Sequence, residues 1–305
     1  MTPAAILALA LILDAIFGEP EALWSRAPHP AVLLGRVVST LDRSLNTGGA
    51  RRLKGALAVL GLVCASGIIG WIIHALPDAG VLECLAVAVL VAQKSLIDHV
   101  RGVAQGLRKS LADGRQQVAM IVGRDTAHMD QTAVARAAIE SAAENFSDGV
   151  VAPIFWYALL GLPGILIYKA VNTADSMIGY RTPQHAAFGW AAARLDDVLN
   201  WVPARLTAGL IAALSGTLAW WPAIAADARL HRSPNAGWPE AAMARALGAA
   251  LSGPRSYHGE MRDFPFVYSE GRRDAGPDDI DATVRKLWQA WAIFPLTAAL
   301  LAVIF

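Results

Sequence analysis

Charged residues are scarce in this chain. Only 17% of its 305 residues are Asp, Glu, Lys or Arg, while 55% are hydrophobic and the mean hydropathy is +0.42. Soluble domains usually carry about 25% charged residues, so the deficit predicts a surface that faces lipid. The formal net charge is only +1 and no Lys/Arg cluster is present, which argues against a DNA-binding groove and predicts no nucleic-acid partner.

Cysteines and short catalytic motifs are also sparse. Cys64 and Cys84 both lie in apolar runs, so we expect two small hydrophobic side chains rather than a disulfide or a metal site. There is no GxxxxGK[ST] loop, no strand–GxGxxG–helix unit, no CxxC pair, no HExxH and no GxSxG. The histidines show no ligand spacing. Residues 4–13 are apolar but lack a preceding basic region, so we expect no cleavable signal peptide.

Long apolar runs dominate what is present. Residues 55–76, 206–226 and 287–305 are nearly free of charge, and at about 1.5 Å per residue each can cross a hydrocarbon core of roughly 30 Å. A fourth run, residues 150–171, is broken at residues 161–164, which membranes tolerate where the backbone is buried or lines a cavity. The chain is predicted to be an all-α polytopic integral membrane protein with about four to six segments, some re-entrant or broken, and a cytoplasmic helical portion. We expect one domain over residues 1–305.

Basic residues predict the orientation of the first two runs. Residues 77–80 form a turn, and residues 81–92 return into an amphipathic helix that continues past residue 100. The positive-inside rule places both basic flanks in the cytoplasm and the turn outside. The sidedness of residues 172–205 and 227–286 stays open, because the runs before them either cross or turn back. Residues 227–286 are expected outside the membrane with short helices. The basic flanks are Arg43, Arg51, Arg52 and Lys54 before the first run, and Arg101, Arg108 and Lys109 after the second.

The first polar segment is residues 121–153, IVGRDTAHMDQTAVARAAIESAAENFSDGVVAP. It predicts a helix that starts after an Asp130 N-cap and ends before Gly149. Within this helix, acids at helical spacing share a face with an arginine. This pattern is typical either of a surface ladder of ion pairs or of a functional site, and the adjoining membrane run favours a site. Carboxylates with an Asn amide suit Mg²⁺. The set is Arg136, Glu140, Glu144, Asn145 and Asp148.

Three further segments carry polar side chains. Residues 168–181, YKAVNTADSMIGYR, place a polar stripe on one helical arc that suits phosphate and hydroxyl groups, although a lone Lys there is also a typical snorkelling anchor. Residues 193–205, ARLDDVLNWVPAR, offer oxygens to a divalent cation, or form a merely solvated acid pair. Residues 233–242, SPNAGWPEAA, predict a turn and then a helix with Pro239 at its first position, whose free N–H groups attract anions. Asp14, Glu19, Arg26 and His29 add a weaker N-terminal group.

With these segments the chain resembles the CobD/CbiB family of adenosylcobinamide-phosphate synthases. The resemblance rests on DAIFGEP, HPAVLLGR, VGRDT, AIESAAENFSDGVVAP, YKAVNTADSMIGYR, RLDDVLNWVPARL and SPNAGWPEAAMA, and is weaker over residues 254–286. It implies an acid–amine ligase of cobalamin biosynthesis in the inner membrane, with its site facing the cytoplasm. The implied reaction joins adenosylcobyric acid to (R)-1-aminopropan-2-ol phosphate, or to aminopropanol, with ATP and Mg²⁺.

The expected site residues divide by role. Glu140, Glu144, Lys169 and Asp175 are the expected catalytic residues. The expected substrate- or phosphate-binding residues are Arg124, Asn172, Ser176, Tyr180, Arg181, Arg194 and Asn235. The expected metal ligands are Asp148, Asn145, Asp196 and Asp197. Besides the two substrates, the expected partners are membrane lipid and either a second copy or other cobalamin-assembly enzymes. The alternative functions are a non-catalytic sensor, as in a membrane family tied to β-lactamase induction, and a transporter, which the broken run favours.

Overall fold

The computed structural model describes residues 1–257 and 259–304, and almost all regular structure in them is helical. The contacts divide the chain into two compact units. Unit 1 comprises Met1–Ala92, Ala152–Asn200 and Phe294–Phe305, and unit 2 comprises Gln93–Val151 and Trp201–Ile293. Each unit is built from segments that are discontinuous in sequence. The expectation of a single domain over residues 1–305 stays a prediction.

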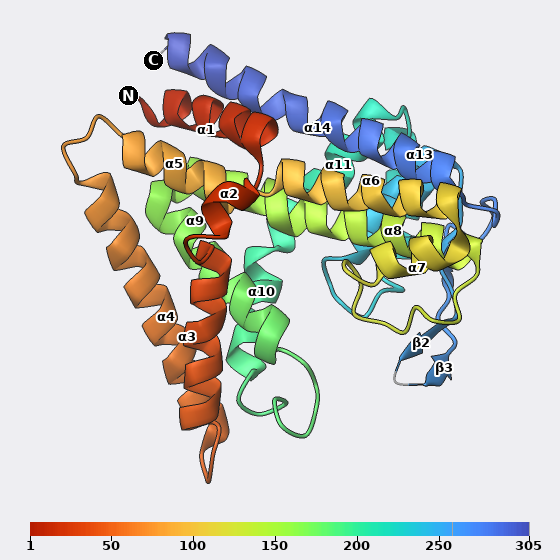
Figure 1. The fold of residues 1–305 in the computed structure, drawn as a ribbon, viewed down its shortest axis with the longest axis horizontal. Helices are drawn as coiled ribbons and strands as arrows, with labels where there is room; N and C mark the ends of the chain where they lie inside the picture. The colour runs from red at the N-terminus through yellow and green to blue at the C-terminus, as the bar shows by residue number, and fades with distance from the viewer. Residues whose placement is uncertain (258, 305) are drawn as a thin grey trace. The chain divides into compact units, whose positions relative to one another are not determined.

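In unit 1, α3, α4 and α10 pack on α9 (Figure 1). The packed core includes Val38, Leu62, Ala174 and Phe188. Small residues allow the close approach of α4 to α9, since a Cβ on Gly70 would lie 2.6 Å from the Pro163 Cα. The helices of this unit are α1 (Pro3–Phe17), α2 (Glu21–Trp24), α3 (Pro30–Leu45), α4 (Arg51–His74), α5 (Val81–Leu90), α9 (Ala152–Ile178), α10 (Trp190–Leu199) and the C-terminal end of α14 (Pro277–Ile304).

The predicted break in the apolar run 150–171 is confirmed within α9. Gly161 has φ 65° and ψ −155°, a conformation that is essentially restricted to glycine, and Pro163 follows it inside the helix. The helix continues after this break, and its C-terminal end carries the polar stripe of residues 169–176.

In unit 2, α8 is the central helix and packs against α6, α7, α13 and β1 (Figure 1). Most of its alanines are buried, so neighbouring elements approach closely. The helices are α6 (Gln93–Lys109), α7 (Leu111–Val118), α8 (Gln131–Phe146), the π-helix η1 (Ser147–Val151), α11 (Trp201–Leu214), the 3₁₀-helix η2 (Leu218–Trp220), α12 (Trp221–Ala228), α13 (Gly237–Leu247) and most of α14. The strands are β1 (Leu251–Ser252), β2 (Arg255–Tyr257), β3 (Glu260–Arg262) and β4 (Phe266–Val267); β1 pairs with β4 and β2 with β3, both antiparallel.

The predicted bounds of α8 are confirmed, but the predicted start of α13 is wrong. The Asp130 N-cap is present, with its carboxylate accepting from the Ala133 N–H at 2.7 Å, and α8 ends at Phe146, before Gly149. Gly149 lacks the positive φ of a C-terminal cap, and η1 carries the chain into α9. Pro239 is the third residue of α13 rather than its first. The helix begins at Gly237, where a side chain would collide with the Ala228 carbonyl.

Residues 206–226 do not form one spanning helix, contrary to the prediction from their hydropathy. The helix α11 ends at Leu214, Gly216 turns the backbone into the left-handed region at φ 69°, and α12 starts at Trp221. The short strands β1–β4 also lie where only short helices were expected.

The prediction of an all-α membrane protein is confirmed. Within residues 1–257 and 259–304, three helical stretches are long and apolar enough to cross a membrane, Arg51–His74, Gln131–Ile178 and Pro277–Ile304, and Pro3–Phe17 and Trp201–Leu214 are shorter apolar helices. Large apolar side chains on α4 are exposed rather than packed, as on a lipid-facing surface. They include Leu57, Leu60, Ile68, Ile69, Trp71 and Ile72.

Candidate functional site

The Glu140 carboxylate on α8 is the centre of a buried charge cluster in unit 2. Its Oε2 accepts hydrogen bonds from the guanidinium groups of Arg124 at 2.8 Å and Arg255 at 3.3 Å. Its Oε1 accepts from the Ser252 N–H at 2.7 Å, and Ser252 adopts φ 63°, a rare conformation for a non-glycine residue. Only 4% of the Glu140 side chain is exposed. Because two guanidinium groups share one carboxylate, the three side chains together carry a net positive charge at a fixed position.

These two arginines line a cleft of about 230 Å³. A third arginine, Arg136, comes from the preceding turn of α8 and packs over the ring of Phe266, with 5.4 Å between its Cζ and the ring centroid. Only 9% of the Arg124 side chain and 11% of the Arg255 side chain are exposed, so both guanidinium groups are largely desolvated. The lining residues are Arg124, Asp125, His128, Met129, Asp130, Ala133, Arg136, Glu140, Ser252, Pro254, Arg255, Ser256 and Met261.

A second buried carboxyl, Glu240 of α13, lies close to this cluster. Burial raises the pKa of Glu240 well above its usual range, and the charges of Glu140 and Glu144 raise it further. Its Oε1 lies 3.8 Å from the Nε2 of His231, and burial lowers the pKa of that imidazole. Within the described residues, its Oε2 has no hydrogen-bond partner. Burial therefore favours the protonated form of Glu240 and the neutral form of His231.

The remaining predicted residues of unit 2 are divided between this cluster and its surroundings. Glu144 is near enough to Glu240 to influence its ionisation. Asn145 is exposed and donates from Nδ2 to the Ser141 carbonyl at 2.9 Å. Asp148 is half-buried in η1. Asn235 is buried elsewhere, where its Oδ1 accepts from Arg205 at 3.1 Å.

Unit 1 contains a separate polar cluster around Asp196 of α10. One carboxylate oxygen accepts from the Asn172 amide at 3.2 Å and the other from the Asn200 amide at 3.0 Å, while the Tyr168 hydroxyl donates to Asn200 at 2.9 Å. Burial raises the pKa of Asp196 to about 6, against the lowering effect of the two amides. The predicted stripe on α9 and the predicted acid pair on α10 thus meet through Asn172 and Asp196.

The other predicted residues of unit 1 are more open. Asp197 lies 3.6 Å from Arg194 and is also influenced by Arg181. Lys169 is within electrostatic range of His29, whose pKa is lowered by burial, while Glu19 acts in the opposite direction. The three residues that end the stripe are only loosely enclosed: Asp175 is half-buried, and Ser176 and Tyr180 are exposed.

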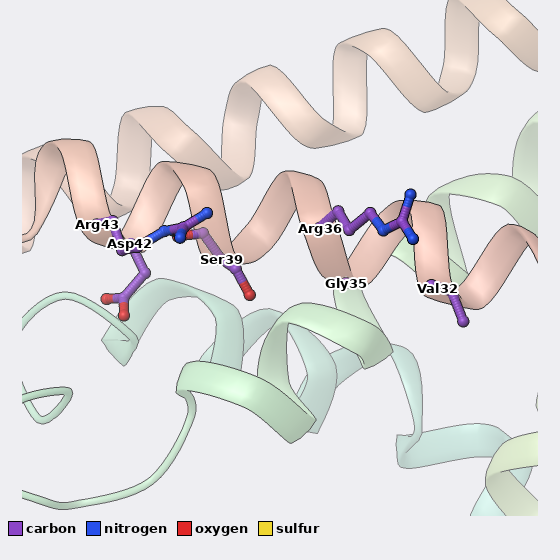
Figure 2. Close-up of a pocket in the computed structure, with 6 residues that line it drawn as sticks. All are labelled: Val32, Gly35, Arg36, Ser39, Asp42 and Arg43. Carbon is purple, nitrogen blue, oxygen red and sulfur yellow. The ribbon is translucent and has the colours of Figure 1, made fainter. Parts of the chain in front are cut away.

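A cleft in unit 1 lies along α3 and contains none of the predicted residues (Figure 2). Its volume is about 520 Å³, and Arg36, Ser39, Asp42 and Arg43 lie along it. Asp42 accepts from the Asn46 amide at 2.8 Å and lies 3.3 Å from the Nε2 of His185. All of its lining residues come from one face of one helix, so it is an open surface rather than an enclosed site.

Sequence reasoning missed three residues of the Glu140 cluster: Ser252, Arg255 and Glu240. Glu240 had a usable signal, because it is a lone acid among the apolar residues of α13. Arg255 had none, since it pairs with Glu140 from 115 positions away, in the stretch where the family motifs are weakest.

No group of three His, Cys, Asp or Glu side chains in residues 1–257 and 259–304 is arranged to hold a metal. The predicted ligands Asn145 and Asp148 belong to unit 2, and Asp196 and Asp197 to unit 1. Mg²⁺ usually binds one or two carboxylates and completes its shell with water and substrate phosphates, so either pair fits an ion that arrives with a nucleotide. ATP and Mg²⁺ stay predictions.

The fold and the clusters around Glu140 and Asp196 define a helical membrane protein with desolvated, charged side chains in its interior. In this class of protein such residues commonly mark a binding or catalytic site. The family model described as "CobD/Cbib protein" matches residues 7–287, so the chain belongs to the CobD/CbiB family. Relatives named "Cobalamin biosynthesis protein CobD" are 47% identical in Sinorhizobium fredii (98% of this chain, 97% of the relative) and 49% in Rhizobium meliloti (96% and 95%). A third, from Rhodobacter capsulatus, is 44% identical (100% and 99%). No solved structure matches. The protein therefore has a role in cobalamin biosynthesis.

Proposed function

We propose that the protein is an ATP-dependent acid–amine ligase that joins adenosylcobyric acid to (R)-1-aminopropan-2-ol phosphate, or to aminopropanol, to give adenosylcobinamide phosphate or its unphosphorylated counterpart. Family membership and the names of the relatives support the pathway. The observation that carries the chemistry is the buried Glu140 carboxylate, which fixes two desolvated arginines at a cleft. Such groups stabilise phosphate charge more strongly than solvated ones.

The reaction needs an activated carboxylate, because hydroxide is a poor leaving group. In the proposed sequence a carboxylate oxygen of the corrinoid attacks the γ-phosphorus of ATP, and ADP leaves. The amine then attacks the acyl carbon, and inorganic phosphate departs with the former carboxylate oxygen. The ammonium proton passes to a carboxylate base. We assign that role to Glu144, since burial favours the protonated form of its neighbour Glu240.

Glu140 acts in this scheme by holding Arg124 and Arg255, not by touching the substrate. The predicted residues of unit 1 keep their proposed roles: Lys169 and Asp175 in catalysis, and the polar and basic residues beside them in phosphate binding. Bound Mg²⁺ would neutralise nucleotide phosphates, held by one or two of the predicted ligands. We further propose that the protein lies in the inner membrane with this chemistry on the cytoplasmic side.

An isotope experiment with the purified full-length protein in detergent tests the proposal. Corrinoid carrying ¹⁸O in its free carboxylate is incubated with the amine, ATP and Mg²⁺, and the products are resolved by mass spectrometry. The expected products are ADP and ¹⁸O-labelled inorganic phosphate, formed only when both substrates are present. Labelled AMP would show that the activated intermediate is an acyl adenylate and not an acyl phosphate. Absence of label from both would rule out activation by ATP, as a sensor or a transporter would predict.

A further inference from the structure

Arg136 differs from the other two arginines of the unit 2 cleft. Glu140 engages Arg124 and Arg255, whereas Arg136 forms no ion pair or hydrogen bond within the described part of the chain. It packs over Phe266 and lies within electrostatic range of Glu140 and Asp130. Its guanidinium lines the same cleft and is free to bind a ligand. The Nε of Arg255 is a further buried donor there without a hydrogen-bond partner among the described residues. The Arg136 guanidinium and the Arg255 Nε are therefore available to donate hydrogen bonds to a ligand in this cleft.

The charges that line the cleft favour an anion at its arginine end. Three arginines and three acids line the cleft, and two of the acids also accept hydrogen bonds from uncharged donors. Asp125 accepts from the Ser256 hydroxyl and the Gly259 N–H, both at 2.7 Å, and Asp130 caps α8. Among the described lining residues, Glu140 is the acid that forms ion pairs with these arginines, and Asp130 lies within electrostatic range of Arg136. Arginine forks match phosphate oxygens and bind them through charge-assisted hydrogen bonds.

The size of the cleft limits the ligand. Its volume of about 230 Å³ lies below the roughly 300–1,000 Å³ of pockets for drug-sized ligands, so it fits a phosphate on a few carbons and not a corrinoid. We propose that Arg124, Arg136 and Arg255 form the subsite for the phosphate monoester of the amine substrate, with Arg136 as the residue that selects phosphorylated over unphosphorylated amine. This proposal rests on the proposed function, since it assigns one of its substrates to a place.

The first test is the choice between two amines. Wild type, Arg136→Gln and Arg136→Lys are assayed with aminopropanol phosphate and with aminopropanol. Loss of a charged hydrogen-bonding partner is expected to raise the KM for the phosphorylated amine roughly 10-fold to 100-fold in Arg136→Gln. The KM values for aminopropanol and for ATP should stay unchanged, and Arg136→Lys should lie in between. Arg101→Gln, which removes an exposed arginine of α6, is the matched control and should behave as wild type.

The results separate the alternatives. An equal rise in KM for both amines would overturn the proposal, because it would mean general damage. A rise only in the KM for ATP would overturn it in favour of the nucleotide as the source of the phosphate.

A second test does not depend on turnover. Inorganic phosphate is titrated into the detergent-solubilised protein, and the melting temperature is recorded. Phosphate should raise it in wild type and Arg101→Gln but much less in Arg136→Gln, and an identical rise in all three variants would contradict the subsite. If wild type forms no amide with either amine while phosphate still stabilises it through Arg136, the proposed function fails, and the arginines bind the phosphate of a ligand other than this amine.

Discussion

The Glu140 carboxylate and the Arg124 guanidinium form a buried ion pair at 2.8 Å, with 4% and 9% of their side chains exposed. Because Arg255 shares the same carboxylate, removal of Glu140 leaves two desolvated cations without a counter-ion. We expect Glu140→Ala to lower the free energy of unfolding by roughly 3–5 kcal/mol. Glu140→Gln, which keeps the shape, should lower turnover roughly a hundredfold because the arginines lose their anchor.

Thermal unfolding in detergent and the ligase assay measure both effects. Lys94→Ala provides the control, since it breaks the exposed pair with Asp98, whose contribution should be below about 1 kcal/mol. A Glu140→Ala protein as stable as this control would mean that the cluster is not closed to water in solution.

The same cluster marks the limit of prediction from sequence. The spacing of the acids on α8 and the capping Asp130 were sufficient to predict the helix and to single out Glu140. A surface ladder with Arg136, the alternative to a site, does not hold Glu140, because Arg255 and Ser252 reach it from the distant strands β2 and β1. Pairing over such separations leaves no periodic signal in the sequence.

Hydropathy had a similar limit at residues 206–226. The run is apolar throughout, so its composition cannot distinguish one long helix from α11 and α12 joined at Gly216. By contrast, the break in α9 was predictable, because Gly161 and Pro163 together disfavour a straight helix. The sequence predicted the polar segments that contain Asn172 and Asp196 separately, but not the contact between them. That contact depends on the packing of α10 against α9.

Asp196 makes stability depend on pH. Its pKa rises from a usual value near 3.8 to about 6, because burial disfavours the ionised carboxylate. Between these values the folded protein keeps a proton that the unfolded chain has lost, so stability falls as pH rises from about 4 to about 6. The total loss is on the order of 3 kcal/mol. Asp196→Asn should remove this slope and be more stable than wild type at pH 7.

The difference between the unfolding curves of wild type and Asp196→Asn isolates this group from all others that titrate. Asp197→Asn, altered at the less buried neighbouring acid, is the control. A wild-type protein that gains stability relative to Asp196→Asn over this range would show that the ionised carboxylate is the favoured form.

Two glycines of α4 provide a matched pair for its packing against α9. A Cβ at Gly70 would lie 2.6 Å from the Pro163 Cα, whereas a Cβ at Gly61 would meet nothing within 4 Å. Gly70→Ala should therefore force the helices apart and cost roughly 1–3 kcal/mol. Gly61→Ala should be neutral or stabilise by up to about 1 kcal/mol through helix propensity. Unfolding midpoints in detergent measure both, and equal values would mean that this close approach does not exist in solution.

The two ends of α4 test its passage through the membrane. This helix has 24 residues, exposed apolar side chains along its length and a basic N-terminal end, so we expect residue 49 in the cytoplasm and residue 77 outside. Gly49 has open space around it, and Pro77 is exposed, so Gly49→Cys and Pro77→Cys should leave the fold intact. Both are made in a background with Cys64→Ser and Cys84→Ser, since Cys64 is exposed. A membrane-impermeant maleimide on intact inner-membrane spheroplasts should label residue 77 at once and residue 49 only after the membrane is opened. Labelling of both ends from one side would mean that α4 does not cross, and extraction of the protein by carbonate would remove the membrane assignment altogether.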